Sequence, residues 1–185
     1  AKKVLEIGTF TGFSALAMSS ALGPHGHLTT IEKDPDTAQI AQKNFDGKPW
    51  DSKIELKLGD GMDVLDQLSV SDPEGFDMVF LDANKKQYSN YFTKIMELGL
   101  LKKGGVLVVD NILWKGRVPQ LYTKSEEERL EEANQFQRKG VMSLVEADKY
   151  AEAMHKFNTL VREDERVQVV MLPLRDGLSL IRRKA

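Results

Sequence analysis

Short segments rich in apolar residues alternate with longer amphipathic segments along the first 110 residues. Residues 4–7, 28–32, 54–58, 76–81 and 106–109 are short apolar runs bounded by turn signals, and they predict five strands. Each segment ends in polar or glycine residues and leads into a stretch with helical spacing. This repetition of strand, polar end and helix predicts a doubly wound α/β fold with a mostly parallel sheet.

The connecting helices are predicted over residues 12–18, 35–45, 62–68 and 88–98, and residues 101–105 are expected to form a turn. The second of these helices has a proline at its first position, where the missing N–H group is not needed. Polar residues at the carboxyl ends of the strands then collect at one rim of the sheet, where ligands bind in open α/β folds.

The pattern changes in the last third of the chain. A loop is expected over residues 114–119, an exposed charged helix over 125–138 and another helix over 143–161. Two further strands, 166–172 and 178–183, flank a turn that contains an Asp-Gly pair, as in a hairpin. The sheet is therefore expected to have seven strands, with an antiparallel strand at the C-terminal end.

Composition narrows the functional class. A chain of 185 residues with 41% hydrophobic and 29% charged residues fits one globular domain. The net charge of −2, with acids and bases interspersed, argues against nucleic acid as a partner. The absence of cysteine excludes disulfides and thiolate sites. Because no apolar run is long enough to span a bilayer, we expect no membrane partner and a cytoplasmic location.

The stretch 4–14, VLEIGTFTGFS, carries the first candidate binding site. Gly8 ends a strand and Gly12 opens a helix, so backbone N–H groups can approach a ligand without a Cβ between them. Phe10 stands where a dinucleotide-binding G-x-G-x-x-G loop would have its second glycine, which makes a NAD-dependent dehydrogenase a weak alternative. The loop is better suited to a nucleoside-type cofactor without a pyrophosphate, and S-adenosylmethionine (SAM) is the candidate.

Acidic residues follow the other strands. Glu32 ends the second strand about 20 residues beyond the glycine loop, where nucleotide-binding folds place a carboxylate for ribose hydroxyls. Asp82, Asp110 and Asn111 end the fourth and fifth strands and offer only oxygen ligands, which favour Mg²⁺, Mn²⁺ or Ca²⁺. The alternative for these residues is a local turn role, in which Asp82 caps a loop and Asp110 initiates an Asx-turn.

Two adjacent lysines, Lys85 and Lys86, follow the first of these acids. A lysine close to a divalent cation loses its proton more readily, because the two positive charges repel each other. Such a lysine is suited to act as a general base toward a substrate hydroxyl. Spacing alone does not choose between the two lysines, and one of them is expected to face solvent.

Four stretches together resemble the cation-dependent O-methyltransferases, the caffeoyl-CoA and catechol O-methyltransferase group of Rossmann-like enzymes. They are VLEIGTFTGFS, LDANK, VVDNILWKG and LPLRDGLSLIRR, and the resemblance covers nearly the whole chain but is weaker over 115–165. It implies that Lys85 is the general base and that Asp82, Asp110 and Asn111 hold the metal. The residues that it places around SAM are Glu6, Gly8, Thr9, Ser14, Glu32, Gly61 and Asn84.

The resemblance implies a reaction as well. The cation binds two vicinal hydroxyls of a phenolic, catechol-type small molecule and lowers the pKa of one of them. The lysine removes its proton, and the oxygen attacks the methyl group of SAM. Family members are often dimers, so a homodimer is a further expectation. The remaining alternative to an enzyme is a non-catalytic relative that binds SAM or metal only.

The sequence departs from the family in three places. Family members carry helical turns before the first strand, and we expect this N-terminal cover to be missing here. Lys115 stands where the plant caffeoyl-CoA enzymes have asparagine, which argues against a CoA ester as the acceptor. The segment 115–165 is longer than the usual connection. We expect one methyltransferase domain over 1–185, with 115–165 as a helical, insertion-like segment near the acceptor.

Overall fold

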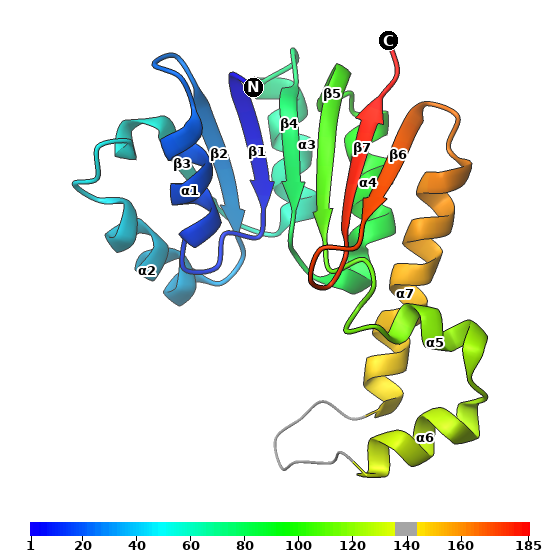
Figure 1. Ribbon diagram of the computed structural model, residues 1–185. Helices are drawn as coiled ribbons and strands as arrows, with labels where there is room; N and C mark the ends of the chain where they lie inside the picture. The colour runs from blue at the N-terminus through cyan, green and yellow to red at the C-terminus, as the bar shows by residue number, and fades with distance from the viewer. Residues whose placement is uncertain (136–143) are drawn as a thin grey trace.

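The computed structural model describes residues 1–135 and 144–185 (Figure 1). Its strands form one seven-stranded sheet in the order β3-β2-β1-β4-β5-β7-β6. Strand β7 is antiparallel to both of its neighbours, and the other pairs are parallel. This confirms the predicted fold. The strands are β1 (Lys3–Ile7), β2 (His27–Glu32), β3 (Ile54–Leu58), β4 (Phe76–Leu81), β5 (Leu101–Asp110), β6 (Val167–Leu172) and β7 (Leu178–Arg183).

Helices follow the strands as the apolar pattern indicates. Asp34 caps α2 by accepting the N–H of Thr37 at 2.7 Å, and Asp60 caps α3 by accepting the N–H of Met62 at 3.0 Å. No described helix is long and apolar enough to cross a membrane. The helices are α1 (Phe13–Ala21), α2 (Pro35–Phe45), α3 (Gly61–Ser71), α4 (Tyr88–Glu97), α5 (Arg117–Thr123), α6 (Glu126–Gln135) and α7 (Leu144–Glu163), with short 3₁₀ turns at Asp51–Lys53 and Lys85–Gln87.

Two local predictions were wrong. The expected loop over 114–119 gives way to helix α5 after Gly116, because Val118 is buried and Arg117 pairs with Asp148 of α7 at 2.7 Å. The expected turn over 101–105 is the first half of β5, and a register shift against β4 accommodates its glycine pair. Helix α3 is also longer than the predicted 62–68. The predicted helices over 125–138 and 143–161 each include residues, 136–138 and 143, that lie outside the described part of the chain.

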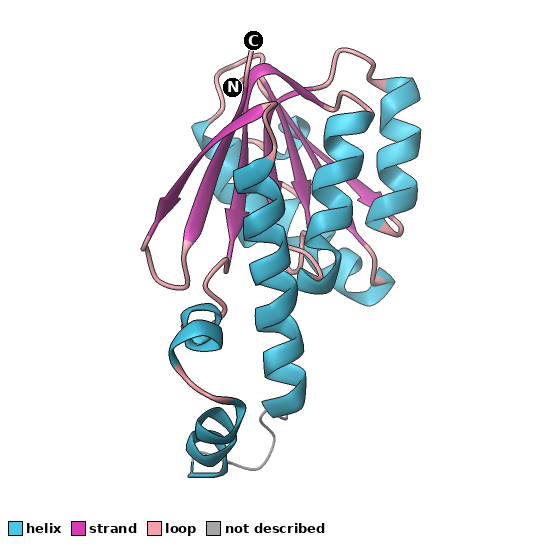
Figure 2. Cartoon of the chain, turned by 90° about the vertical axis from the view of Figure 1, so that its right-hand side faces the viewer, coloured by secondary structure: helices cyan, strands magenta, loops and turns pink. Residues whose placement is uncertain are grey.

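The two faces of the sheet are covered differently. One face packs against α3, α4 and α7, where the Phe157 ring meets the Tyr88 ring edge-on with centroids 5.6 Å apart. On the other face, α1 and α2 cover the strands from β3 to β1 around buried Phe45 (Figure 1). The long helix α7 continues below the sheet, beside α5 and α6 (Figure 2).

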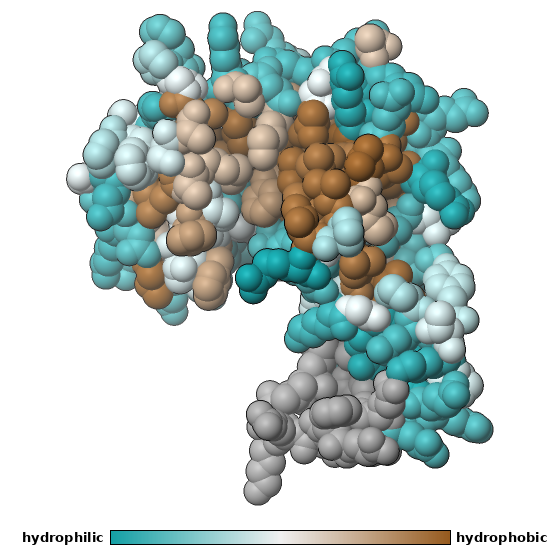
Figure 3. Space-filling view, viewed as in Figure 1, coloured by the Kyte–Doolittle hydropathy of each residue, from teal (hydrophilic) through white to brown (hydrophobic). Residues whose placement is uncertain are grey.

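An apolar row continues across the second face beyond α1. Phe80, Val108, Leu180 and Val170 are neighbours in register on β4, β5, β7 and β6. None of the four is fully buried, and Val170 is 56% exposed. Figure 3 shows hydrophobic side chains gathered on this face of the molecule. A parallel sheet normally carries helices on both faces, so this half of the second face is open in the described chain.

Candidate active site

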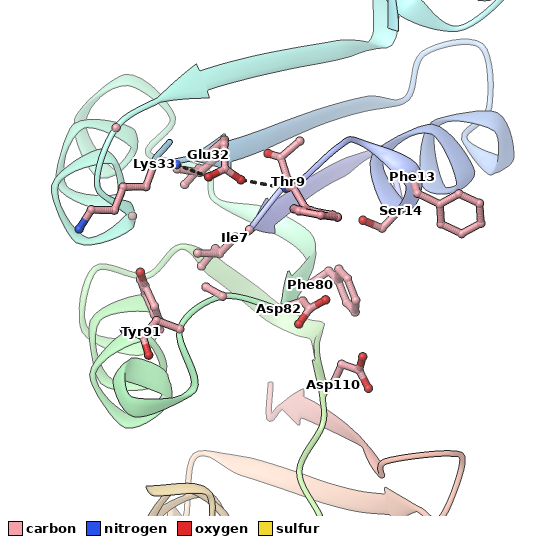
Figure 4. Close-up of a pocket in the computed structure, with 17 residues that line it drawn as sticks. Ile7, Thr9, Phe13, Ser14, Glu32, Lys33, Phe80, Asp82, Tyr91 and Asp110 are labelled. Atoms are coloured by element: carbon pink, nitrogen blue, oxygen red, sulfur yellow. Dashed lines mark hydrogen bonds between the residues drawn. The ribbon is translucent and has the colours of Figure 1, made fainter. Parts of the chain in front are cut away.

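A cavity of about 610 Å³ opens at the carboxyl ends of the strands (Figure 4). It lies between the β1–α1 loop, the end of β2, the start of α3 and the loops that follow β4 and β5. Asp82 and Asp110 lie on one side of it, and Glu32 and Lys33 lie on the opposite side (Figure 4). Of the residues expected around a cofactor, those that line it are Gly8, Thr9, Ser14, Glu32, Gly61 and Asn84.

The glycine loop has a backbone that other residues adopt only with strain. Gly8 has φ +102° and Gly12 has φ +90°. A Cβ at Gly8 would collide with the carbonyl oxygen of Asp82, and one at Gly12 would collide with the Phe45 ring. The glycines therefore let the ends of β1 and β4 approach each other, and the N–H of Asp82 donates to the carbonyl of Ile7 at 3.0 Å.

Glu6 is the one expected cofactor residue that does not line the cavity. Its side chain is fully buried and accepts hydrogen bonds from the hydroxyls of Ser14 and Thr30, the latter at 2.5 Å. Burial raises the pKa of this carboxyl to about 7, against the two hydrogen bonds, which lower it. The position supports an indirect role, in which Glu6 holds Ser14 at the cavity wall.

Glu32 closes the loop over the cavity. One carboxylate oxygen accepts the backbone N–H of Phe10 at 2.8 Å, and the other accepts those of Lys33 and Asp34, each at 2.9 Å. Its side chain is thus fixed by three backbone donors and still borders the cavity. A carboxylate oxygen has a second lone pair, so Glu32 can also accept a hydroxyl from a ligand.

The opposite wall carries the charged groups. The Lys85 ammonium is 2.5 Å from an Asp82 oxygen, and its side chain is only 14% exposed. Asp110 accepts the backbone N–H of Asn111 at 2.7 Å. Burial raises the pKa of Asp110, and the nearby carboxylates of Asp82 and Asp176 raise it further. Negative charge is therefore concentrated here.

This wall has the chemistry of a hard-cation site. The described part of the chain holds no group of three histidine, cysteine, aspartate or glutamate side chains arranged for a metal. The set expected from the sequence contains two carboxylates and one amide, and Asp82 and Asp110 are close enough for the charge of Asp82 to raise the pKa of Asp110. Oxygen donors with excess negative charge fit Mg²⁺, Mn²⁺ or Ca²⁺. Asp82, Asp110 and Asn111 remain the residues that could hold such an ion.

The two adjacent lysines occupy different surroundings. Lys85 points to Asp82 and borders a second cavity, whereas the Lys86 ammonium lies 4.5 Å from the centre of the Tyr150 ring and 3.9 Å from Glu146. Lys86 is also the more exposed of the two, at 42%. Of the two lysines, only Lys85 borders this second cavity, and its partner Asp82 borders the first.

The second cavity, of about 390 Å³, adjoins the first and shares Ala83 and Asn84 with it. Trp114 and Tyr150 form its aromatic wall, with ring centroids 4.8 Å apart and planes inclined by 27°. The other lining residues are Lys85, Asn111, Lys115 and Asp176. The loop 82–85 thus separates the larger cavity, at the glycine loop, from this smaller one, which we call the aromatic cavity.

Several lining residues were not expected from the sequence. Tyr91 lies on α4 beside Gly61, where a Cβ would touch its hydroxyl. Tyr150 belongs to α7, and Asp176 lies in the β6–β7 turn. In the sequence, the two tyrosines look like ordinary aromatic residues of amphipathic helices, and Asp176 looks like part of an Asp-Gly turn. Neither pattern indicates a binding site.

Comparisons with known proteins identify the family of the chain. The family described as O-methyltransferase matches residues 1–184. Over 181 residues the chain is 33% identical to mouse (Mus musculus) "Catechol O-methyltransferase domain-containing protein 1", covering 97% of this chain and 60% of that protein. Over 184 residues it is 31% identical to "Caffeoyl-CoA O-methyltransferase 1" of Eucalyptus globulus, covering 99% of this chain and 67% of that protein.

The fold comparison gives the same answer. The crystal structure of the O-methyltransferase from Bacillus cereus in complex with SAH superposes with a TM-score of 0.80 and 25% sequence identity, over 100% of this chain and 74% of that one. The chain spans only part of the length of its relatives and covers 60% of the mouse protein. Because the family match covers nearly every residue, the chain belongs to the O-methyltransferase family.

Proposed function

We propose that the protein transfers the methyl group of SAM to a hydroxyl of a catechol-type small molecule with the help of a divalent cation. The observation that carries this proposal is the position of the loop 82–85. It separates the cavity at the glycine loop from the cavity at Trp114 and Tyr150. The ion pair between Asp82, which borders the first, and Lys85, which borders the second, crosses this boundary. A reaction between two bound molecules needs such a junction.

The larger cavity is the proposed place for SAM. Its volume of about 610 Å³ lies within the range of small-molecule sites. Gly8 and Gly61 let the backbone approach the ligand, and Glu32 borders the cavity with lone pairs that can accept ribose hydroxyls. The related Bacillus cereus enzyme was crystallised with SAH, the product that remains after SAM gives up its methyl group.

Asp82, Asp110 and Asn111 are the proposed ligands of the cation. A divalent ion there would supply a positive charge that lowers the pKa of a phenolic hydroxyl and orients its oxygen. The chain contributes two carboxylates on neighbouring strand ends, and burial raises the pKa of the half-buried Asp110, so a cation there would favour its ionised form. Among the described residues, Lys85 is the one cation that an ion pair links directly to this set.

Lys85 is the proposed general base. It borders the aromatic cavity, its ammonium pairs with Asp82 of the larger cavity, and its side chain is largely shielded from solvent. In its neutral form, the amine can accept the proton of a hydroxyl bound in the aromatic cavity. Loss of that proton leaves the oxygen negative and nucleophilic, and the amine becomes the ammonium again.

The aromatic cavity is the proposed place for the methyl acceptor. Trp114 and Tyr150 stack on each other and together line this cavity, where an aromatic acceptor can contact the pair. The names of the relatives include both catechol and caffeoyl-CoA enzymes, so names alone do not select the acceptor. Asn111 borders this cavity, and Asp82 and Asp110 border the other. A cation held by these three residues would lie at the wall between the cavities and could bind two adjacent hydroxyls of the acceptor. We therefore favour a vicinal diol.

Transfer of labelled methyl from SAM to a panel of catechols tests the proposal. The panel includes matched phenols with a single hydroxyl, and each assay is run with Mg²⁺ and with EDTA. We expect labelled product from the vicinal diols with Mg²⁺ only. Product that survives EDTA would overturn the cation requirement. Binding of SAM without product from any acceptor would instead favour a non-catalytic SAM-binding protein.

A further inference from the structure

Hydrogen bonds join the turn between β6 and β7 to the loop that follows β5, although the two segments are more than 60 residues apart in the chain. One carboxylate oxygen of Asp176 accepts the backbone N–H of Lys115, and the other accepts the side-chain Nδ2–H of Asn111 at 3.3 Å. The backbone adds two bonds: the N–H of Leu113 donates to the carbonyl of Asp176 at 2.9 Å, and that of Ile112 to the carbonyl of Gly177 at 3.2 Å.

This loop needs an external support, because its backbone is strained. Asn111, Trp114 and Lys115 have φ of +62°, +45° and +55°, a region that residues with a Cβ rarely occupy. Such conformations persist only where the surroundings fix them, and they concentrate at functional sites. Asp176 bonds to the first and the last of these three residues. It therefore holds both ends of the strained segment.

The same contact decides which way the Asn111 amide points. An ionised carboxylate can only accept hydrogen bonds, so the amide must present its NH₂ group to Asp176. The carbonyl oxygen Oδ1 is then at the opposite end of the amide, directed away from Asp176. Within the described chain, no hydrogen bond engages Oδ1. The side chain thus offers an oxygen, and not an NH₂ group, for coordination.

We infer that Asp176 is a positioning residue that selects the amide orientation in which Asn111 can bind a divalent cation. The inference rests on the proposed function, since Asn111 is there a cation ligand. Residues that bond to metal ligands commonly fix ligand orientation, and their loss typically weakens metal affinity by about 10–100-fold. Asp176 would act in this way through Asn111 and not as a ligand of the ion.

Substitution Asp176→Asn changes the orientation of the Asn111 amide while it keeps part of the support, and it also removes one negative charge near Asp110. The new side chain keeps one oxygen, which can still accept the N–H of Lys115, but it turns an NH₂ group toward Asn111. Two NH₂ groups cannot bond to each other, so the Asn111 amide reverses and presents its own NH₂ group to the cation. The double variant Asn111→Asp/Asp176→Asn reverses the polarity of the contact and restores an oxygen at position 111.

The test is Mn²⁺ binding by the full chain, followed by calorimetry, with SAM affinity and thermal unfolding measured on the same samples. We expect Asp176→Asn to weaken Mn²⁺ binding by about 10–100-fold with little change in unfolding temperature or SAM affinity. The double variant should recover most of the loss. Substitution Asp176→Ala, which removes the support as well, should also lower the unfolding temperature.

The possible failures are distinct. Unchanged Mn²⁺ affinity in Asp176→Asn, or a double variant as weak as the single one, would overturn the role of Asp176 and leave the proposed function standing. A fall in SAM affinity equal to the fall in Mn²⁺ affinity would also overturn it, because it would show general damage. If the unaltered chain binds no Mn²⁺, both the cation requirement and this inference are wrong.

Discussion

The rim of the sheet has two halves that are built by different means. The donor half surrounds the larger cavity and depends on backbone shape. The acceptor half depends on side-chain charge and on contacts between distant loops. The donor half comprises Gly8 and Glu32 at the cavity wall together with Glu6 and Gly12 behind it. The acceptor half comprises Asp82, Lys85, Asp110, Asn111 and Asp176.

The difference predicts how each half responds to mutation. Gly8 approaches the backbone of Asp82 too closely for any side chain, and Glu6 is fully buried, so changes there disturb folding and binding together. Asp110 and Lys85 are charged groups at the cavity edge, and their removal leaves the packing largely intact. Stability and activity should therefore separate in the acceptor half and stay coupled in the donor half.

The largest effect is expected from Gly8→Ala. A Cβ at φ +102° meets the carbonyl oxygen of Asp82, and we expect a loss of stability on the order of 3 kcal/mol together with loss of SAM binding. Urea unfolding and calorimetry measure the two effects. Gly23→Ala is the matched control, because a Cβ there meets nothing within 4 Å. Normal stability and SAM affinity in Gly8→Ala would contradict the backbone role of the donor half.

Asp110→Ala is expected to reduce cation-dependent turnover at least ~100-fold while SAM affinity stays close to normal. Burial and neighbouring carboxylates raise the pKa of Asp110, which shows that its charge is unfavourable in the folded protein. The unfolding temperature should therefore be unchanged or higher. Equal losses of turnover and SAM affinity would show that the two halves are not independent.

Lys85→Met is expected to lower turnover by about 10²–10⁴-fold, the contribution typical of a general base. Methionine keeps most of the length of the side chain, so SAM affinity and unfolding temperature should change little. Lys86→Met is the matched control, because Lys86 lies against Tyr150 outside the junction. Similar turnover in the two variants would remove Lys85 from the mechanism.

The smallest effect concerns pH and the donor half. The folded pKa of Glu6 is about 7, against an ordinary value of 4.5, so the folded protein keeps this proton longer than the unfolded chain. The contribution of Glu6 to stability is therefore most favourable below pH 4.5 and declines as the pH rises to about 7.

Unfolding in urea at several pH values between 4.5 and 8 measures this slope. Glu6→Gln removes the titrating group, so the difference between the two stability curves should change with pH only within that window. Because Ser14 and Thr30 donate to the carboxylate, the variant also loses one acceptor, which shifts its curve by a constant amount. Two parallel curves would mean that Glu6 keeps an ordinary pKa in the folded protein.

The chain's local patterns determine much of this protein. Five short apolar segments with polar ends predict the parallel strands, and the glycine spacing from Gly8 to Gly12 predicts the loop at the larger cavity. The rim position of Asp82 and Asp110 follows from the same rule, because parallel strands end at one edge. These features depend on neighbours in sequence or on strand direction, and both are readable from residue order.

Tertiary structure decided what depends on distant contacts. The sequence did not show that Glu6 is fully buried and bonded to Ser14, or that Tyr150 stacks on Trp114. It also did not show that α5 forms where a loop was predicted. From the sequence, Asp176 was expected only to form a turn. In the structure it accepts a hydrogen bond from the side chain of Asn111, 65 residues away in the chain. The burial of a side chain, the orientation of an amide and the strained backbone of a loop all depend on packing between segments that are distant in the chain. They cannot be predicted from a local sequence pattern.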